Sequence, residues 1–140
     1  MYYLAKKEYD YAIRICAYLA GSGDGAQFTI KELSSVLLIS KPFATKIIYQ
    51  LKQSGIANTI RGKKGGVSLA INPAELSFYQ IFEAMGLMRS VSACINDKNF
   101  CPQPAPCNIH QYFINHELKI IKDLKETTIN NFAFSKDNIE

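Results

Sequence analysis

The sequence lacks any apolar run long enough to cross a lipid bilayer. A membrane-spanning helix needs about 20 mostly apolar residues, and no segment of this chain approaches that length. The first residues do not read as an export signal either. Glu8, Asp10 and Arg14 interrupt the apolar stretch that follows Lys6 and Lys7. We therefore expect a cytoplasmic protein that does not associate with membranes.

Motifs that mark common enzyme classes are also missing. The glycine-rich segment 61–66 lacks the G-x-x-x-x-G-K-[ST] order of a phosphate-binding loop, and a strand rather than a helix is expected after it. We find no Ser-His-Asp set, no paired carboxylates and no cofactor-binding motif. A cysteine nucleophile would need a histidine paired with it. The sequence thus predicts a protein that is not an enzyme and has no small-molecule substrate.

The charge that is present is distributed unevenly. The chain has 140 residues, of which 48% are hydrophobic and 20% charged, as in a single soluble domain or a domain with a helical arm. Residues 1–70 hold ten Lys and Arg against four acids, a net charge of +6, whereas residues 71–140 hold six against eight, a net −2. This asymmetry suggests a polyanion-binding module joined to a second part.

Hydrophobic periodicity predicts three helices before residue 56. The first covers residues 6–20. The second begins after Thr29, which forms a capping box with Glu32. The third begins after Ser40, a good N-cap residue, and ends at Gly55. The short turn between the second and third helices predicts a helix-turn-helix.

A β-hairpin is predicted directly after the third helix. Residues 56–60 and 67–71 alternate in polarity around the glycine-rich loop 61–66. Ser77 and Gln80 then cap another helix that runs to Met85. A helix-turn-helix followed by a hairpin is a winged helix. The expected fold is therefore mainly α, a winged helix-turn-helix domain with a two-stranded wing and a long C-terminal dimerisation helix.

The C-terminal half contains an irregular segment and one long helix. Residues 90–107 show no periodicity and hold three cysteines and three prolines. A helix from about residue 108 to residue 128 has an apolar band wide enough to be buried against a second subunit. We expect a DNA-binding domain at 1–86, a cysteine-rich cluster-binding loop at 87–107, a dimerisation helix at 108–128 and a flexible tail at 129–140.

The third helix has a polar face suited to reading DNA. Helix-turn-helix proteins contact bases from the first turns of this helix. Lysine and threonine can reach base edges or phosphates, and phenylalanine can contact a thymine methyl group. An ordinary amphipathic helix with a solvated lysine face is the alternative. The candidate contact residues are Lys41, Pro42, Phe43, Thr45 and Lys46.

Three cations lie on the predicted wing. Arg61, Lys63 and Lys64 flank the glycines of the hairpin loop, and a tight loop brings such side chains close to phosphates or into the minor groove. Together, the helix-turn-helix and the basic wing indicate binding to double-stranded DNA.

The cysteine segment is a candidate metal site. Cys94, Cys101 and Cys107 form a C-x6-C-x5-C pattern, and His110 follows three residues later. Three clustered cysteines in a cytoplasmic protein do not suggest a structural disulfide framework. With His110 as a fourth ligand they could hold an iron–sulfur cluster or, alternatively, zinc. A thiol/disulfide switch is a further alternative, whereas Cys16 is expected to be buried.

These motifs together resemble those of a known family. The chain is similar to winged-helix regulators that include the iron–sulfur cluster assembly regulator IscR and the nitric-oxide-sensing repressor NsrR. The resemblance extends from Leu4 to about Leu124. Its most specific parts are Ile39-Ser40, the segment 51–56, Arg61-Gly62 with Gly65-Gly66, and the three-cysteine loop.

The resemblance implies a homodimer that binds palindromic promoter DNA and senses redox state, nitric oxide or iron–sulfur status. By motif, four of the helix residues match groove-facing positions, and Arg61 matches a minor-groove arginine of the wing. Those four are Pro42, Phe43, Thr45 and Lys46. Lys63-Lys64 depart from the family pattern, in which this part of the wing is smaller and less charged.

The resemblance also implies a ligand set but leaves the fourth ligand open. The three clustered cysteines match the cluster ligands, although the first gap between them is one residue longer than in the IscR pattern. His110 lies where IscR-like members have a histidine ligand, and Asp10 lies where NsrR-like members have an aspartate that reaches the partner's cluster. Alternatively, Asp10 caps the helix or pairs with Arg14. We prefer His110, and the cluster type, 2Fe–2S or 4Fe–4S, stays open.

Overall fold

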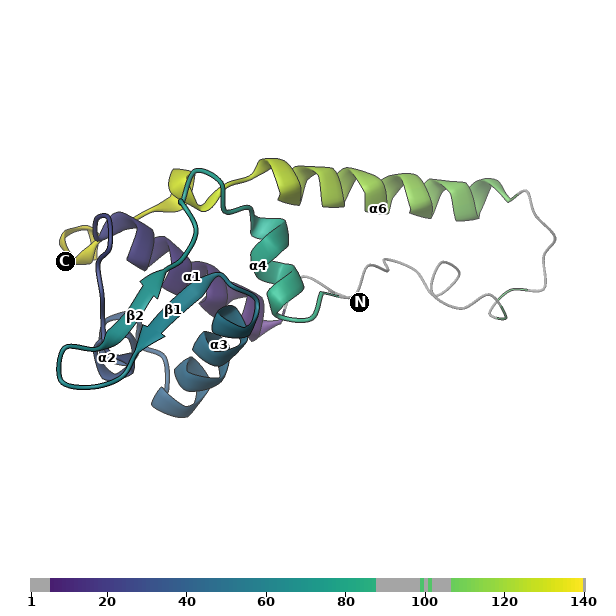
Figure 1. Ribbon diagram of the computed structural model, residues 1–140. Helices are drawn as coiled ribbons and strands as arrows, with labels where there is room; N and C mark the ends of the chain where they lie inside the picture. The colour runs from purple at the N-terminus through teal and green to yellow at the C-terminus, as the bar shows by residue number, and fades with distance from the viewer. Residues whose placement is uncertain (1–5, 88–98, 100, 102–106, 140) are drawn as a thin grey trace.

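The structure is a computed structural model that describes residues 6–87, Asn99, Cys101 and residues 107–139. It is mainly helical with one two-stranded antiparallel sheet, as the sequence predicts (Figure 1). Among the described residues, no helix is both long and apolar enough to cross a membrane. The elements are α1 Lys7–Gly21, α2 Ile30–Leu37, α3 Lys41–Gln53, β1 Ala57–Ile60, β2 Gly66–Leu69, α4 Phe78–Ala84, α6 Asn108–Glu126 and the 3₁₀ helices η1 Ile129–Phe132 and η2 Lys136–Asn138.

Local capping signals fix the start of α2 but not that of α3. The Glu32 N–H donates to Thr29 Oγ1 at 3.1 Å, and the Thr29 N–H donates to Glu32 Oε2 at 2.7 Å. This confirms the predicted capping box. Ser40 occupies the N-cap position of α3, as expected, but its side chain makes no capping hydrogen bond. Leu38, in the left-handed region at φ 55°, makes the turn between α2 and α3.

The wing is the predicted antiparallel hairpin. Ala57 pairs with Leu69 and Ile60 with Gly66, so the hairpin closes around residues 61–65. A Cβ atom at position 65 would lie 2.0 Å from the Ile60 carbonyl oxygen. Only glycine fits there, which explains why the loop can return so tightly.

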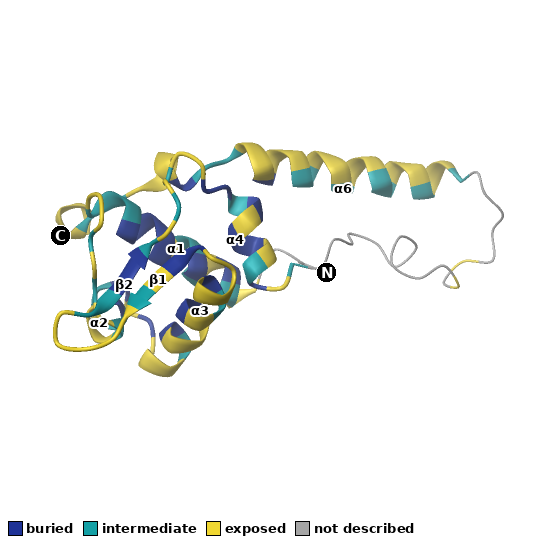
Figure 2. Cartoon of the chain, in the orientation of Figure 1, coloured by how far each residue is buried: buried dark blue, intermediate teal, exposed yellow. Residues whose placement is uncertain are grey.

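The hydrophobic core lies between α1 and the elements around it (Figure 2). Ile15 and Cys16 on α1 are fully buried, as the periodicity predicts. Leu33 of α2 and Ile47 of α3 are buried in the same core. Burying these faces fixes α3 in place and turns its opposite face toward solvent.

The long helix α6 projects from this body (Figure 1). Leu124, near its C-terminal end, is buried and belongs to the core. The Lys125 Nζ lies 4.8 Å from the centre of the Tyr79 ring on α4. Farther toward its N-terminus, α6 carries exposed apolar side chains, including Leu118.

The expectation of a flexible tail at 129–140 is wrong for residues 129–134. Ile129 is fully buried, and its N–H donates to the Leu76 carbonyl oxygen at 2.9 Å. The Phe134 N–H donates to the Ala17 carbonyl oxygen at 3.2 Å, and the Phe134 ring packs against Tyr18. The segment is too short to show a periodicity. Its order comes instead from α1 and α4, which accept its apolar side chains.

Candidate nucleic-acid interface and metal centre

The polar face of α3 carries the predicted contact residues. Lys41, Pro42, Thr45 and Lys46 are exposed, while Ala44 on the opposite face is fully buried. This arrangement follows from helical spacing, because residues three or four apart share a face. The Thr45 Oγ1 donates to the Lys41 carbonyl oxygen at 2.8 Å.

Phe43 and Lys46 make contacts with α1. The Phe43 side chain is half-buried, and its ring meets the Tyr11 ring edge-on at a centroid distance of 5.2 Å. The Lys46 Nζ lies 3.7 Å from Glu8 Oε1. Two of the five predicted residues therefore also join α1 to α3.

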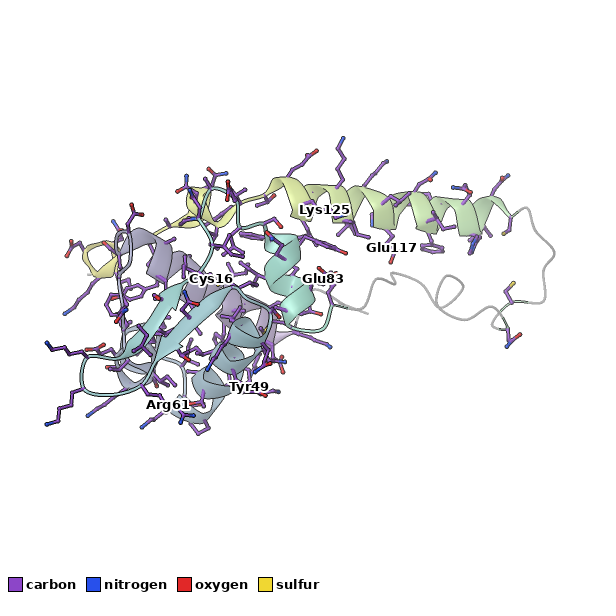
Figure 3. The ribbon with its side chains drawn as sticks, viewed as in Figure 1. Cys16, Tyr49, Arg61, Glu83, Glu117 and Lys125 are labelled. Carbon is purple, nitrogen blue, oxygen red and sulfur yellow. The ribbon has the colours of Figure 1, made fainter. Side chains whose placement is uncertain are left out.

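A groove of about 460 Å³ separates α3 from the wing. Thr45 and Tyr49 lie on its α3 side, and Ile60 and Arg61 lie on its wing side. Figure 3 labels Tyr49 and Arg61, which come from these two elements. Among the described residues that line this groove, none is acidic. Four are cationic, namely Lys31, Lys41, Lys52 and Arg61.

The groove also contains residues that were not singled out from the sequence, among them Tyr49, Lys52 and Lys31. Tyr49 and Lys52 lie on the same helical face as Thr45, so the spacing that selected Thr45 could have found them. Lys31 comes from the N-terminal end of α2, and only the packing of α2 against α3 brings it to the groove. Lys63 and Lys64 are exposed on the wing loop but do not line the groove.

The cysteine segment is described only in part. Cys94 lies outside the described residues. Cys101 is exposed, and Cys107 is half-buried at the N-cap position of α6; neither is in a disulfide. His110 lies in the first turn of α6 and is half-buried. Within the part of the chain that the structure describes, no three His, Cys, Asp or Glu side chains come together as a metal site.

Cys16 lies in the hydrophobic core, and Asp10 forms an ion pair at the surface. Burial raises the pKa of the Cys16 thiol to about 12, so this thiol stays protonated at neutral pH, and it is closed off from solvent in the core. The Asp10 Oδ2 lies 2.9 Å from the Arg14 guanidinium, and both side chains are largely exposed. Asp10 thus makes the ion pair that was the alternative to ligation.

The donor chemistry of the cysteine segment fits a metal centre. Cys101 and Cys107 are thiols outside the core, and His110 offers an imidazole one turn after Cys107. Thiolate sulfur and imidazole nitrogen are ligands for both zinc and iron–sulfur clusters. The donor types therefore suit either group and do not choose between them.

Comparisons with known proteins agree with this architecture. A family model described as Rrf2, iron-dependent transcriptional regulator, matches residues 5–134. The HTH-type transcriptional regulator NsrR of Bacillus subtilis is 27% identical over 131 residues, which are 93% of this chain and 90% of that protein.

Solved structures share the fold at lower sequence identity. CymR (YrzC), the global cysteine regulator of B. subtilis, superposes with a TM-score of 0.77 at 18% identity, covering 91% of this chain and 94% of that one. T. potens IscR superposes with a TM-score of 0.70 at 16% identity, covering 89% and 82%.

Proposed function

The chain belongs to the Rrf2 family of transcriptional regulators, and from that premise we propose that it controls promoters in the cytoplasm through a bound iron–sulfur cluster. As a member of this family it is a DNA-binding regulator and not an enzyme. The finer proposal has three parts: how the protein reads DNA, how it dimerises and how its cysteines sense a signal.

The groove between α3 and the wing supports the proposal that the protein binds DNA. Four cations and no acidic side chain line it among the described residues, which matches the repeated negative charge of a duplex. Lys41, Pro42, Phe43, Thr45 and Lys46 read bases or neighbouring phosphates in the major groove. Arg61 enters the minor groove, and Lys63 and Lys64 contact its phosphates.

The long helix supports dimerisation. Its exposed apolar side chains include Ile109 and Leu118, which are 68% and 58% exposed. Burying them against a second copy would remove apolar surface from water. A two-fold symmetric dimer presents two recognition helices, so its target is a palindromic site with half-sites about one helical turn apart.

The cysteine segment supports sensing. Cys94, Cys101 and Cys107 would hold the cluster, with His110 as the preferred fourth ligand and Asp10 as its rival. To bind metal, Asp10 would have to leave its ion pair with Arg14, an exposed pair that costs little to break. When bound, the cluster supplies a centre that can change redox state, react with nitric oxide or lose iron.

Cys107 links such a signal to the dimer helix. It occupies the N-cap position of α6, and the Gln111 N–H donates to its carbonyl oxygen at 3.0 Å. A change in what the Cys107 thiolate binds therefore acts directly on the start of α6. Moving α6 would alter the spacing of the two recognition helices and hence the affinity for DNA.

Anaerobic purification tests the identity of the metal. We expect a brown protein containing iron and sulfide, with the absorption and EPR signals of a cluster. Cys101→Ala should lose most of the iron, and Cys16→Ala should keep it. His110→Ala should change the spectrum more than Asp10→Ala does. A colourless protein with stoichiometric zinc would favour the alternative, a regulator with a zinc or thiol/disulfide switch.

Operator binding tests the role of the cluster. The wild-type protein with and without cluster should differ in affinity for a duplex that it enriches from a random-sequence library. Equal affinity in the two states would leave the cluster without a part in switching.

A further inference from the structure

We infer that Tyr49 donates a hydrogen bond from its phenolic O–H to a backbone phosphate of the DNA strand that lies between α3 and the wing. This inference rests on the proposed DNA-binding function and adds a contact that neither the sequence motifs nor the family resemblance assigns.

The position of Tyr49 along α3 argues against a base contact. Tyr49 lies eight residues after Lys41, which is about 12 Å along a helix that rises 1.5 Å per residue. The base-reading residues of a helix-turn-helix lie in the first turns of the recognition helix. A side chain two turns later meets the edge of the major groove, where the sugar–phosphate backbone runs.

The surroundings of Tyr49 suit a backbone strand. Its side chain is 61% exposed, and across the groove Ile60 is 54% exposed. The aromatic ring lines one side of the groove and the isoleucine lines the other, so each offers apolar surface against which a deoxyribose can pack. Lys52 on α3 and Arg61 on the wing place positive charge at the same groove, as a chain of phosphates requires.

The tyrosine hydroxyl fits a particular role in this groove. A neutral O–H can donate to a phosphate oxygen, and hydroxyls of this kind are common phosphate contacts that fix the register of a protein on DNA. Unlike a lysine, the hydroxyl brings no charge and releases no counterion. Its contribution should therefore be independent of salt concentration.

The test compares Tyr49→Phe with Lys52→Gln in the full-length protein. The probe is a fluorescent duplex enriched by the wild-type protein from a random library, and a random duplex of equal length serves as the non-specific probe. Tyr49→Phe should weaken binding to both by about 2- to 10-fold, the loss expected for one neutral hydrogen bond. The slope of log affinity against log salt should stay unchanged. Lys52→Gln should reduce that slope by about one.

Phosphate ethylation interference locates the contact. One ethylated phosphate in each half-site should weaken binding of the wild-type protein but not of Tyr49→Phe, because the variant has already lost that contact. Tyr112→Phe is the matched control. It removes a hydroxyl from another exposed tyrosine, on α6, and should bind both duplexes as the wild type does.

Three outcomes would overturn the inference. Unchanged affinity of a folded Tyr49→Phe would show that the hydroxyl makes no contact. A loss confined to the enriched duplex would assign Tyr49 to a base instead. Absence of DNA binding by the wild type would overturn the proposed function together with this inference, whereas the first two outcomes leave the proposed function intact.

Discussion

At the scale of single residues, an acidic side chain lies beside the recognition helix. Glu8 approaches Lys46 to 3.7 Å, and the two side chains are 30% and 58% exposed. A pair this exposed contributes little to stability. Its carboxylate nevertheless lowers the positive potential at a predicted DNA contact. Glu8 is therefore placed to weaken binding without contacting DNA.

Replacing Glu8 by Gln should strengthen DNA binding by about 2-fold at low salt, because one unit charge about 8 Å from a phosphate is worth about 0.5 kcal/mol in water. Fluorescence anisotropy titrations at several salt concentrations measure the effect, which should shrink as salt rises. Glu126→Gln, at the C-terminal end of α6, is the control and should leave affinity unchanged. Weaker binding by Glu8→Gln would mean that the ion pair positions Lys46 rather than masking it.

The cysteines should differ sharply in reactivity. The pKa of Cys16 is raised to about 12 by burial, so below that pH the native state keeps this thiol protonated, and solvent cannot reach it. Brief treatment of the metal-free protein with iodoacetamide at pH 8, followed by peptide mass spectrometry, should label Cys101 and Cys107 but not Cys16. Labelling of Cys16 at the same rate as Cys101 would contradict the burial described here.

At the scale of elements, features that depend on residues close together in the sequence could be predicted. Features that depend on packing between distant segments could not. Thr29 and Glu32 form their capping box within one helical turn, so the sequence alone reveals it. The wing follows from alternation around a glycine loop in the same way. The order of Ile129 and the arrival of Lys31 at the groove both depend on packing between distant segments. No pattern local to those residues predicts either.

The packed segment after α6 can be tested by truncating one side chain. Ile129→Ala removes a fully buried side chain and should lower the free energy of unfolding by about 2–4 kcal/mol. Urea unfolding followed by circular dichroism measures the change. The slope of the unfolding free energy against urea concentration should stay the same. The matched control Ile139→Ala, at a half-exposed position, should cost less than 0.5 kcal/mol. Equal effects of the two substitutions would support the original expectation that residues 129–140 form a flexible tail.

At the scale of the whole molecule, the sequence predicted more of the DNA-binding groove than of the cysteine site. Of the four cations that line the groove between α3 and the wing, the sequence identified Lys41 by helical spacing and Arg61 by the hairpin pattern. The sequence predicted the cysteine site by donor type, three cysteines and a histidine, because the spacing of donors along a chain does not fix how they converge in space. Membership of the Rrf2 family is the reason to assign the groove and the cysteine site to one transcriptional regulator.

Dimerisation through α6 is the prediction that belongs to this scale. Leu118→Glu places a charge on the exposed apolar stripe and should convert the dimer to a monomer, because burying an unpaired carboxylate at an interface is costly. Sedimentation velocity measures the change. Lys119→Glu, about 100° around the helix from Leu118, should remain dimeric. A dimeric Leu118→Glu would place the interface on another surface.

The long helix is fastened to the body at its C-terminal end, where Leu124, Ile129 and Phe134 join the core or pack against it. These contacts join α6 and the residues after it to the part of the chain that precedes residue 88. A protease that cuts the backbone within residues 88–106 should therefore yield two fragments that separate on a denaturing gel yet migrate as one particle in gel filtration. The protein can thus lose the continuity of the chain within residues 88–106 and still hold the parts on either side together.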